Sequence, residues 1–504
     1  MENQPVKWTI MAYINADNIL ANFAVESLKQ LRNAASENVV VIAEFDDNQQ
    51  PDARVYLFKG DEKTRKAPLE ESLIPRDELA KLEHIRDVDM TRPETLTEFI
   101  DFASEISATE RYCLILWGHG IELLLDEDRR FTDENDLGRA RGYVKPGNAT
   151  SEHNGGHLAR YLSAKNLGKA LAATKLAKGN LATNHPKMVV APVTLKPGRT
   201  LDIIGLDACS MSMIEIATVV QEYADFMIAS QEDVPDASFP YERILEDLEN
   251  DEEMRGNVTR VCERIPQLYK DAFRDYIATP NTGVKGITLA SLNLGDTSSI
   301  TGSLAKLSTA LLHASCDPGK RKLILSARQK AKDFVFGILV DLGDFCECLE
   351  EAFAHREITD SNLLTACAQI QDNLKGPKNG FVLANEVSRQ GSRCHGVSVY
   401  LPFRDETDAT DNAEERFFKG SGAHPTKGSG AHPTKERLAR IQELEADFWM
   451  LKQFRPTGWM EFVKRGWSLI LASEVPLKID YYYSAEQCAA NLTALHEGAL
   501  TKAA

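Results

Sequence analysis

The sequence predicts an α/β fold in which a largely parallel β-sheet carries helices on both faces and a mostly helical C-terminal region follows. Short runs of β-branched and aromatic residues alternate with helical periodicity, as in βαβ units. Two of these runs, 112–117 and 201–206, are apolar enough to be strands buried on both faces. The 504 residues suffice for one large α/β unit with an attached module.

The predicted elements follow one another regularly along the chain. A strand at 8–13 precedes a helix whose apolar residues recur at helical spacing between positions 20 and 31. The start of a later helix is marked by Thr91 and Glu94, which have the spacing of a capping box around Pro93. The other predicted strands lie at 39–45, 54–58, 112–117, 201–206, 225–229, 286–292, 380–384 and 396–401.

Two regions are expected, with a boundary near residue 295. Residues 1–295 hold most of the sheet and include an insertion at 129–199. Residues 296–504 show mainly helical periodicity, with strands near 380–401. The tryptophans near the C-terminus are expected in the core.

A direct repeat interrupts the second region. The octapeptide KGSGAHPT occurs twice in succession within residues 419–434. Its Gly-Ser-Gly and His-Pro elements predict a flexible surface loop. Metal binding by His424 and His432 is the weaker alternative.

Composition and charge exclude several classes of protein. The net charge of -17 argues against a nucleic-acid partner, which a basic face would have to bind. No stretch reaches the 18 or so apolar residues of a membrane span, and the N-terminus has no basic start or long apolar core of a signal peptide. The nine cysteines include no CxxC pair, which argues against a disulfide framework or a zinc ribbon. We therefore expect a cytoplasmic protein without a membrane partner.

The insertion at 129–199 has the opposite charge to the rest of the chain. It holds thirteen basic residues against four acidic ones and is rich in Gly, Asn and Ala. Such a segment predicts a partly mobile, basic insertion tethered to an acidic body.

Two residues with reactive side chains follow the two most apolar strands. LILWGHG places His119 after the strand at 112–117, and LDACSMSMIEIA places Cys209 after the strand at 201–206. In a parallel sheet both ends lie at one edge, where α/β folds bind ligands. A thiol and an imidazole there could catalyse acyl transfer, with the N–H groups of Gly120 and Cys209 holding the oxyanion. A turn histidine and a small buried cysteine are the structural alternatives.

These motifs resemble those of the clostripain-like cysteine peptidases, which belong to the same structural clan as the caspases. The resemblance covers most of the chain and keeps its motifs in order. The stretches that carry it are WTIMAYINADN, DMTRPETLTEFIDF, LILWGHG, LDACSMSMIEIA, ADFMIASQEDVPDASFPYERIL, LVDLGDF and HGVSVYLPF.

The resemblance implies a caspase-like fold in which residues 1–295 form the catalytic region. It implies a catalytic dyad of His119 and Cys209, and Asp207 as the acidic floor of the pocket for an Arg or Lys side chain before the scissile bond. Asp233 and Asp236 are candidates for a second acidic wall. A structural role for Asp207, in capping the following helix, is the alternative. His395 does not match the family's catalytic histidine and is expected to be structural.

The resemblance also implies a latent precursor that is activated by cleavage in the 129–199 insertion. A basic segment tethered beside an acidic pocket is held there at high effective concentration. A solvated loop without a regulatory role is the alternative. The candidate processing residues are Arg129, Arg130, Arg139, Arg141 and Lys145.

The expected activity is therefore that of a cysteine endopeptidase with protein or peptide substrates that expose Arg or Lys. A partner that activates or regulates the enzyme is also expected. The sequence requires no cofactor and contains no DxDxDG-type loop, although the resemblance leaves calcium dependence open. Two other functions stay open: a catalytically silent scaffold that binds basic peptides, and an amide or ester hydrolase that uses the same dyad.

Overall fold

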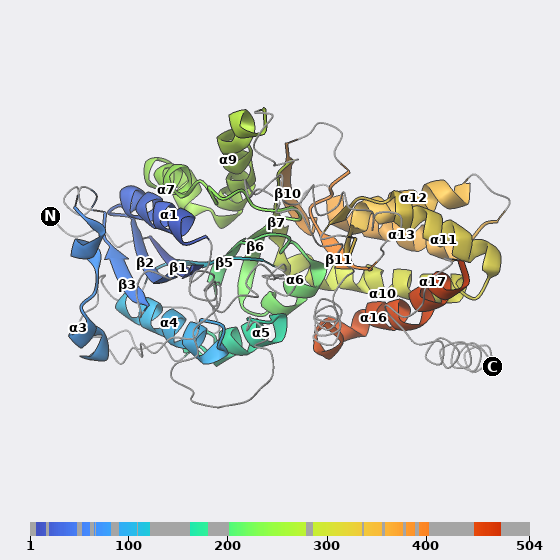
Figure 1. Ribbon diagram of the computed structural model, residues 1–504, viewed down its shortest axis with the longest axis horizontal. Helices are drawn as coiled ribbons and strands as arrows, with labels where there is room; N and C mark the ends of the chain where they lie inside the picture. The colour runs from blue at the N-terminus through green and yellow to red at the C-terminus, as the bar shows by residue number, and fades with distance from the viewer. Residues whose placement is uncertain are drawn as a thin grey trace, which may run out of the picture.

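The centre of the molecule is a mixed sheet of eight strands in the order β10-β7-β6-β5-β4-β1-β2-β3 (Figure 1). The computed structural model describes residues 7–16, 20–47, 53–60, 65, 67–81, 90–107, 109–120, 162–179, 201–278, 286–334, 337–354, 358–375, 380–388, 393–402 and 448–474. The strands are β1 (Trp8–Ala16), β2 (Val39–Asp47), β3 (Arg54–Phe58), β4 (Arg111–Trp117), β5 (Leu201–Asp207), β6 (Ala224–Ala229), β7 (Thr288–Asn293) and β10 (Val382–Val387).

The inner strands β2, β1, β4, β5 and β6 pair in parallel, whereas β3, β7 and β10 pair antiparallel to their neighbours. The chain builds outward from β1 to β2 and β3, and then returns to the other side of β1 for β4, β5 and β6. The order therefore reverses between β1 and β4, the place where open α/β sheets bind ligands beyond the carboxyl ends of their strands.

Helices cover both faces of this sheet, as the sequence predicts (Figure 1). One apolar core lies on the face covered by α1 (Ala21–Ala34), α7 (Tyr241–Asn250) and α9 (Val258–Ala278). The core on the other face involves α4 (Pro93–Ile106), α5 (Ala164–Ala173) and α6 (Ile214–Val220). The shorter helices are α3 (Arg76–Lys81), which precedes α4 in the chain, and α8 (Glu252–Gly256), which lies between α7 and α9.

The C-terminal region is mostly helical and also contributes β10 to the central sheet. Its small second sheet has the order β11-β9-β8. Its elements are α10 (Thr297–Ala314), α11 (Pro318–Lys330), β8 (Asp333–Phe334), β9 (Leu339–Asp341), α12 (Leu342–Ala354), α13 (Ser361–Lys375), β11 (Ser398–Tyr400), α16 (Trp459–Glu461), the π-helix η6 (Phe462–Trp467) and α17 (Ser468–Glu474).

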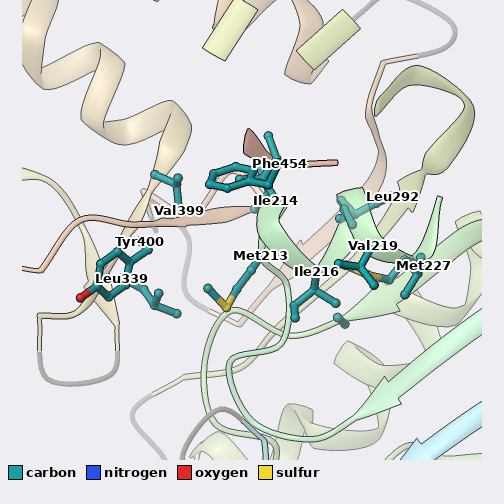
Figure 2. Close-up of a cluster of buried hydrophobic side chains, with 14 of the residues drawn as sticks. Met213, Ile214, Ile216, Val219, Met227, Leu292, Leu339, Val399, Tyr400 and Phe454 are labelled. Carbon is teal, nitrogen blue, oxygen red and sulfur yellow. The ribbon is translucent and has the colours of Figure 1, made fainter. Parts of the chain in front are cut away.

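An apolar core joins this region to the helix that follows β5. Figure 2 shows Met213 and Ile214 of this segment among side chains from the C-terminal region, including Val399 and Phe454. The Met213 main chain also forms a parallel bridge with Ser398. The C-terminal region therefore packs against the element that directly follows Cys209 in sequence.

Three local predictions have clear outcomes. The predicted capping box at Thr91 is wrong: Pro93 is the first residue of α4, which makes Arg92 the N-cap, and no side chain caps the helix there. Trp459 and Trp467 are buried, as expected for core tryptophans, whereas Trp449, also expected in the core, is only partly buried against it. The strands predicted to start at 380 and 396 begin two residues later, at Val382 and Ser398.

No helix in the described ranges is both long and apolar enough to cross a bilayer.

Candidate active site

The carboxyl ends of β4 and β5 bring the two predicted motifs to one edge of the sheet. The strands pair in parallel with Trp117 opposite Asp207. Just beyond them, the Gly118 N–H donates to the Asp207 carbonyl oxygen at 3.3 Å. The segments that carry His119 and Cys209 therefore leave the sheet side by side.

The main chains of these two segments are in direct contact. A Cβ atom added to Gly120 would lie 1.7 Å from the Cys209 carbonyl oxygen, so no residue larger than glycine fits. This contact brings together the two residues whose N–H groups were predicted to hold an oxyanion. His119 directly precedes Gly120 in sequence, and Cys209 is half-buried.

The turn that presents Cys209 is sharp. Ser210 has a φ of +56°, and its N–H donates to the Glu232 carbonyl oxygen at 3.1 Å. From the same neighbouring loop, the Val234 N–H donates to the Cys209 Sγ at 3.3 Å. A donor directed at the sulfur favours the thiolate, which is the nucleophilic form.

Asp207 lies on the sheet face that α7 and α9 cover, and only 3% of it is exposed. One carboxylate oxygen, Oδ2, accepts hydrogen bonds from the Phe239 N–H at 3.1 Å and from the Tyr241 hydroxyl. Burial raises the pKa of Asp207 to about 7, although both hydrogen bonds act to lower it. Asp207 is therefore a buried carboxyl that can change charge near neutral pH.

The other carboxylate oxygen of Asp207 is buried without a hydrogen-bond partner among the described residues, and so is the hydroxyl of Tyr269. The pKa of Tyr269 is raised well above its usual value, by burial and then by the negative charges of Asp207 and Cys209. The hydroxyl therefore lies within electrostatic reach of both groups. Two unsatisfied polar atoms at one site fit a ligand that brings its own donors.

Asp233 and Asp236 lie on the loop after β6, and both are exposed. Desolvation raises the pKa of Asp236, whereas His119 acts to lower it, so carboxylate and imidazole are within electrostatic reach. The structure therefore places Asp236 near His119, whereas Asp207 is buried.

A buried hydrogen-bond network fixes the start of that loop to the C-terminal region. The Gln231 side-chain amide donates to Asp341 Oδ2 at 2.9 Å and to the Ser398 hydroxyl at 3.0 Å. Its carbonyl oxygen accepts from the Gly396 N–H at 2.9 Å. All of these side chains are buried. The C-terminal region thus fixes a residue three positions before Val234, the donor to the Cys209 sulfur.

His395 belongs to this network and is distant from the dyad in its contacts. Its Nδ1 pairs with Asp341 Oδ1 at 2.8 Å, and its Nε2 pairs with Glu347 Oε1 at 3.0 Å. Burial lowers the pKa of His395, but these two carboxylates raise it by more, so the net shift is upward. These contacts are those of a structural histidine.

A cavity of about 120 Å³ opens beside His119 on the opposite face of the sheet from the Asp207 side chain. The Gly118–Gly120 segment and the ends of β1 and β4 line its mouth. Its wall is mainly apolar and includes Leu116, Leu162, Leu167, Met211, Ile216 and Phe448. The cavity therefore lies at the reversal of strand order between β1 and β4.

The predicted processing residues Arg129, Arg130, Arg139, Arg141 and Lys145 lie outside the described residues, as do His424 and His432. Sequence analysis missed Tyr241 and Tyr269 as neighbours of Asp207. Tyr241 lies in the SFPYERIL stretch, so its proximity to the predicted motifs was a usable signal. Tyr269 lies in the middle of an amphipathic helix, where nothing distinguishes it from a core residue.

Comparisons with known proteins agree with this architecture. The model of the clostripain family, Peptidase C11, matches residues 12–135 and 188–409. Among solved structures, an inactive zymogen C11 protease from Parabacteroides distasonis is similar, with a TM-score of 0.54 at 12% identity, covering 91% of this chain and 99% of that one. A secreted C11 cysteine protease from Bacteroides thetaiotaomicron, solved with an irreversible peptide inhibitor, has a TM-score of 0.47 at 14% identity, covering 83% of this chain and 100% of that one. No curated protein matches the chain.

Proposed function

Because the chain belongs to the clostripain family of cysteine peptidases, we propose that it is an endopeptidase that cleaves after Arg or Lys. Cys209 is the nucleophile, His119 transfers protons, and Asp207 binds the P1 side chain, which precedes the scissile bond. One observation carries the proposal: a buried carboxylate with an unpartnered oxygen ends β5, two residues before the Cys209 thiol, and β5 shares its sheet edge with β4, which leads to His119.

The dyad would act by acyl transfer. The Cys209 thiolate attacks the carbonyl carbon, and the oxygen that becomes negative accepts hydrogen bonds from the N–H groups of Gly120 and Cys209. His119 then donates a proton to the leaving amine as the C–N bond breaks. Water, deprotonated by His119, hydrolyses the thioester and restores the thiol.

The surroundings of Asp207 support a basic P1 residue. A guanidinium brings five N–H donors and an ammonium brings three. The free oxygen of Asp207 can accept from either, and so can the unpartnered hydroxyl of Tyr269. An apolar P1 side chain would leave both atoms unsatisfied, and an acidic one would add like charge in a buried site.

Latency is the second part of the proposal. We propose that cleavage in the basic 129–199 insertion, after one of Arg129, Arg130, Arg139, Arg141 or Lys145, activates the precursor. The insertion's excess of basic residues supports this, because a tethered substrate-like segment competes for an acidic site. The similar C11 protease from Parabacteroides distasonis, which was solved as an inactive zymogen, also supports it.

Fluorogenic peptides that differ only at P1, as Arg, Lys, Asp or Leu, test this function. We expect turnover confined to Arg and Lys, reduced by a factor on the order of 10³ or more in Cys209→Ala. Cys316→Ala, which changes an exposed cysteine, is the matched control and should keep full activity. Turnover without a basic preference would refute the assigned specificity, and tight binding of Arg peptides without turnover would favour the silent scaffold.

Calcium dependence and a cytoplasmic location stay predictions from the sequence. Within the described ranges, no group of three or more His, Cys, Asp or Glu side chains is arranged to hold a metal ion. Activity measured with and without a chelator tests the calcium prediction, and fractionation of the cells that make the protein tests its location.

A further inference from the structure

The apolar cavity beside His119 is separate from the Asp207 site. Asp207 faces the core under α7 and α9, which lie on the opposite side of the sheet from α5 (Figure 1). The cavity wall comes from α5, α6 and alternate residues of β4 and β5, such as Leu116 and Leu206. Successive side chains of a strand point to opposite faces. The Asp207 carboxyl and the cavity therefore lie on opposite faces of the sheet at the same edge.

The cavity suits an apolar side chain. Among the described residues its lining contains no Asp, Glu, Lys or Arg. Two of its polar side chains are engaged within the protein: the Tyr13 hydroxyl donates to the Met90 carbonyl at 3.0 Å, and the Ser163 hydroxyl accepts from the Asn166 N–H at 3.2 Å. An apolar cavity of roughly 150 Å³ is enough to bind benzene. A volume of about 120 Å³ is therefore enough for a Leu, Met or Phe side chain to enter at least in part.

The position of the dyad identifies which substrate residue the cavity meets. In an extended substrate, P2 and P1′ both point away from the side of P1, where P1′ follows the scissile bond. The strand order at the edge is β6, β5, β4, β1. Cys209, which attacks the P1 carbonyl, follows β5. His119, which protonates the P1′ amine, follows β4. The cavity is lined by His119 and, further along the same edge, by the end of β1. The P1′ side of the substrate therefore runs toward the cavity.

We propose that this cavity is an S1′ subsite, which selects substrates with a large apolar residue directly after the scissile bond. The proposal rests on the proposed function for its assignment of P1 to Asp207. Together the Asp207 site and the cavity would define a substrate with a basic residue followed by an apolar one.

The subsite also distinguishes the processing candidates. Arg130 is followed by Phe131, whereas the other four candidates are followed by Arg, Ala, Gly or Pro. If the chain processes itself after one of these five candidates, we expect the new N-terminus to be Phe131. The other basic residues of the segment that precede a large apolar or aromatic residue are Arg160, Lys175 and Lys187, and cleavage there would expose Tyr161, Leu176 or Met188 instead. Protein sequencing of the processed chain reads this position directly.

Cleavage of a proteome-derived peptide mixture by the full-length protein tests the subsite, because mass spectrometry reads both sides of every bond cut. We expect Leu, Met, Ile and Phe to be enriched at P1′. Ala164→Leu fills the cavity from the first residue of α5 and should reduce cleavage before large apolar residues by about tenfold, while bonds before Ala or Gly are still cut. Ala172→Leu, on the exposed side of α5, is the matched control and should change nothing.

Leu162→Ala provides a test of opposite sign, because it enlarges the cavity at a partly exposed position. It should extend the P1′ preference to Trp. A basic P1 with an unselective P1′, or with the apolar preference at P2, would overturn the subsite and leave the proposed function intact. An apolar P1′ without a basic P1 would support the subsite and refute the basic specificity. If protein that has been processed in the 129–199 insertion cuts no bond, both proposals fail.

Discussion

The two faces of the sheet meet the catalytic edge with opposite chemistry. On the α7 and α9 side, Asp207 is 3% exposed and one of its oxygens is held by Phe239 and Tyr241. On the α5 and α6 side, an apolar cavity of about 120 Å³ opens beside His119. A charged group can be buried only with hydrogen bonds or a counter-charge, whereas an apolar side chain needs only a dry space of the right size. If both proposals hold, the enzyme recognises the charge of P1 on one face and the shape of P1′ on the other.

Replacing the charge on the first face should have the largest effect. We expect Asp207→Asn to lower kcat/KM for Arg substrates by about 2 to 4 kcal/mol, because a buried ion pair with P1 is lost. Steady-state kinetics with Arg and Leu peptides measures it. Glu215→Gln is a matched control, since Glu215 is also a fully buried carboxyl with a pKa raised to about 7. If the control loses as much, the effect is not specific to P1.

The same substitution should stabilise the protein at alkaline pH. The pKa of Asp207 is about 7 in the folded chain, above the value of about 3.9 in an unfolded one. Between these values the folded state binds more protons, so the free energy of unfolding falls as pH rises and the loss is complete above pH 7. We expect Asp207→Asn to recover about 1 to 3 kcal/mol at pH 8 and little at pH 4, as denaturant titrations would measure. A larger gain at pH 4 than at pH 8 would contradict this assignment.

The loop after β6 is held in place by contacts of Gln231 with residues far away in sequence. Gln231→Ala removes three buried hydrogen bonds and leaves the Gly396 N–H without its partner. We expect the free energy of unfolding to fall by about 2 to 3 kcal/mol. Because the Val234 donor to Cys209 belongs to this loop, kcat should fall by the same factor for all P1 and P1′ residues.

Gln371→Ala is the matched control for this prediction. Its side chain is partly exposed and donates one hydrogen bond, to Glu350 at 3.0 Å. It should cost less than about 0.5 kcal/mol and leave kcat unchanged. A selective loss of Arg cleavage in Gln231→Ala would mean that the network supports the Asp207 face alone.

A smaller change tests the pH dependence of the Asp207 site. Arg cleavage should rise with pH through about 7 as Asp207 ionises. The Tyr241 hydroxyl lowers the pKa of Asp207, so Tyr241→Phe should move this rise to higher pH. We expect about a tenfold loss at pH 6.5 that shrinks by pH 9. A pH profile of kcat/KM measures it, and a loss of equal size at all pH values would indicate a purely structural role.

The sequence carries the information for the elements that end at the catalytic edge. The runs before His119 and Cys209 are apolar enough to identify two buried strands, and parallel strands end at one edge. What the sequence does not show is which side chains from different elements pack together on each face of the sheet. Tyr269 reaches the surroundings of Asp207 from α9, and Gln231 meets Asp341 over 110 positions in sequence. Such contacts depend on how the helices pack against the sheet as a whole, and no local periodicity encodes that packing.

The exposed carboxylates beside the dyad belong to neither face and should matter least. Asp236 is exposed, within electrostatic reach of His119, so salt and water screen its charge. We expect Asp236→Asn to lower kcat/KM for Arg substrates by less than about 1 kcal/mol, and the difference to vanish in 1 M salt. Asp233→Asn, an equally exposed change on the same loop, should behave alike. A loss that persists in high salt would place Asp236 in the P1 pocket beside Asp207, and the charged face would then extend into solvent.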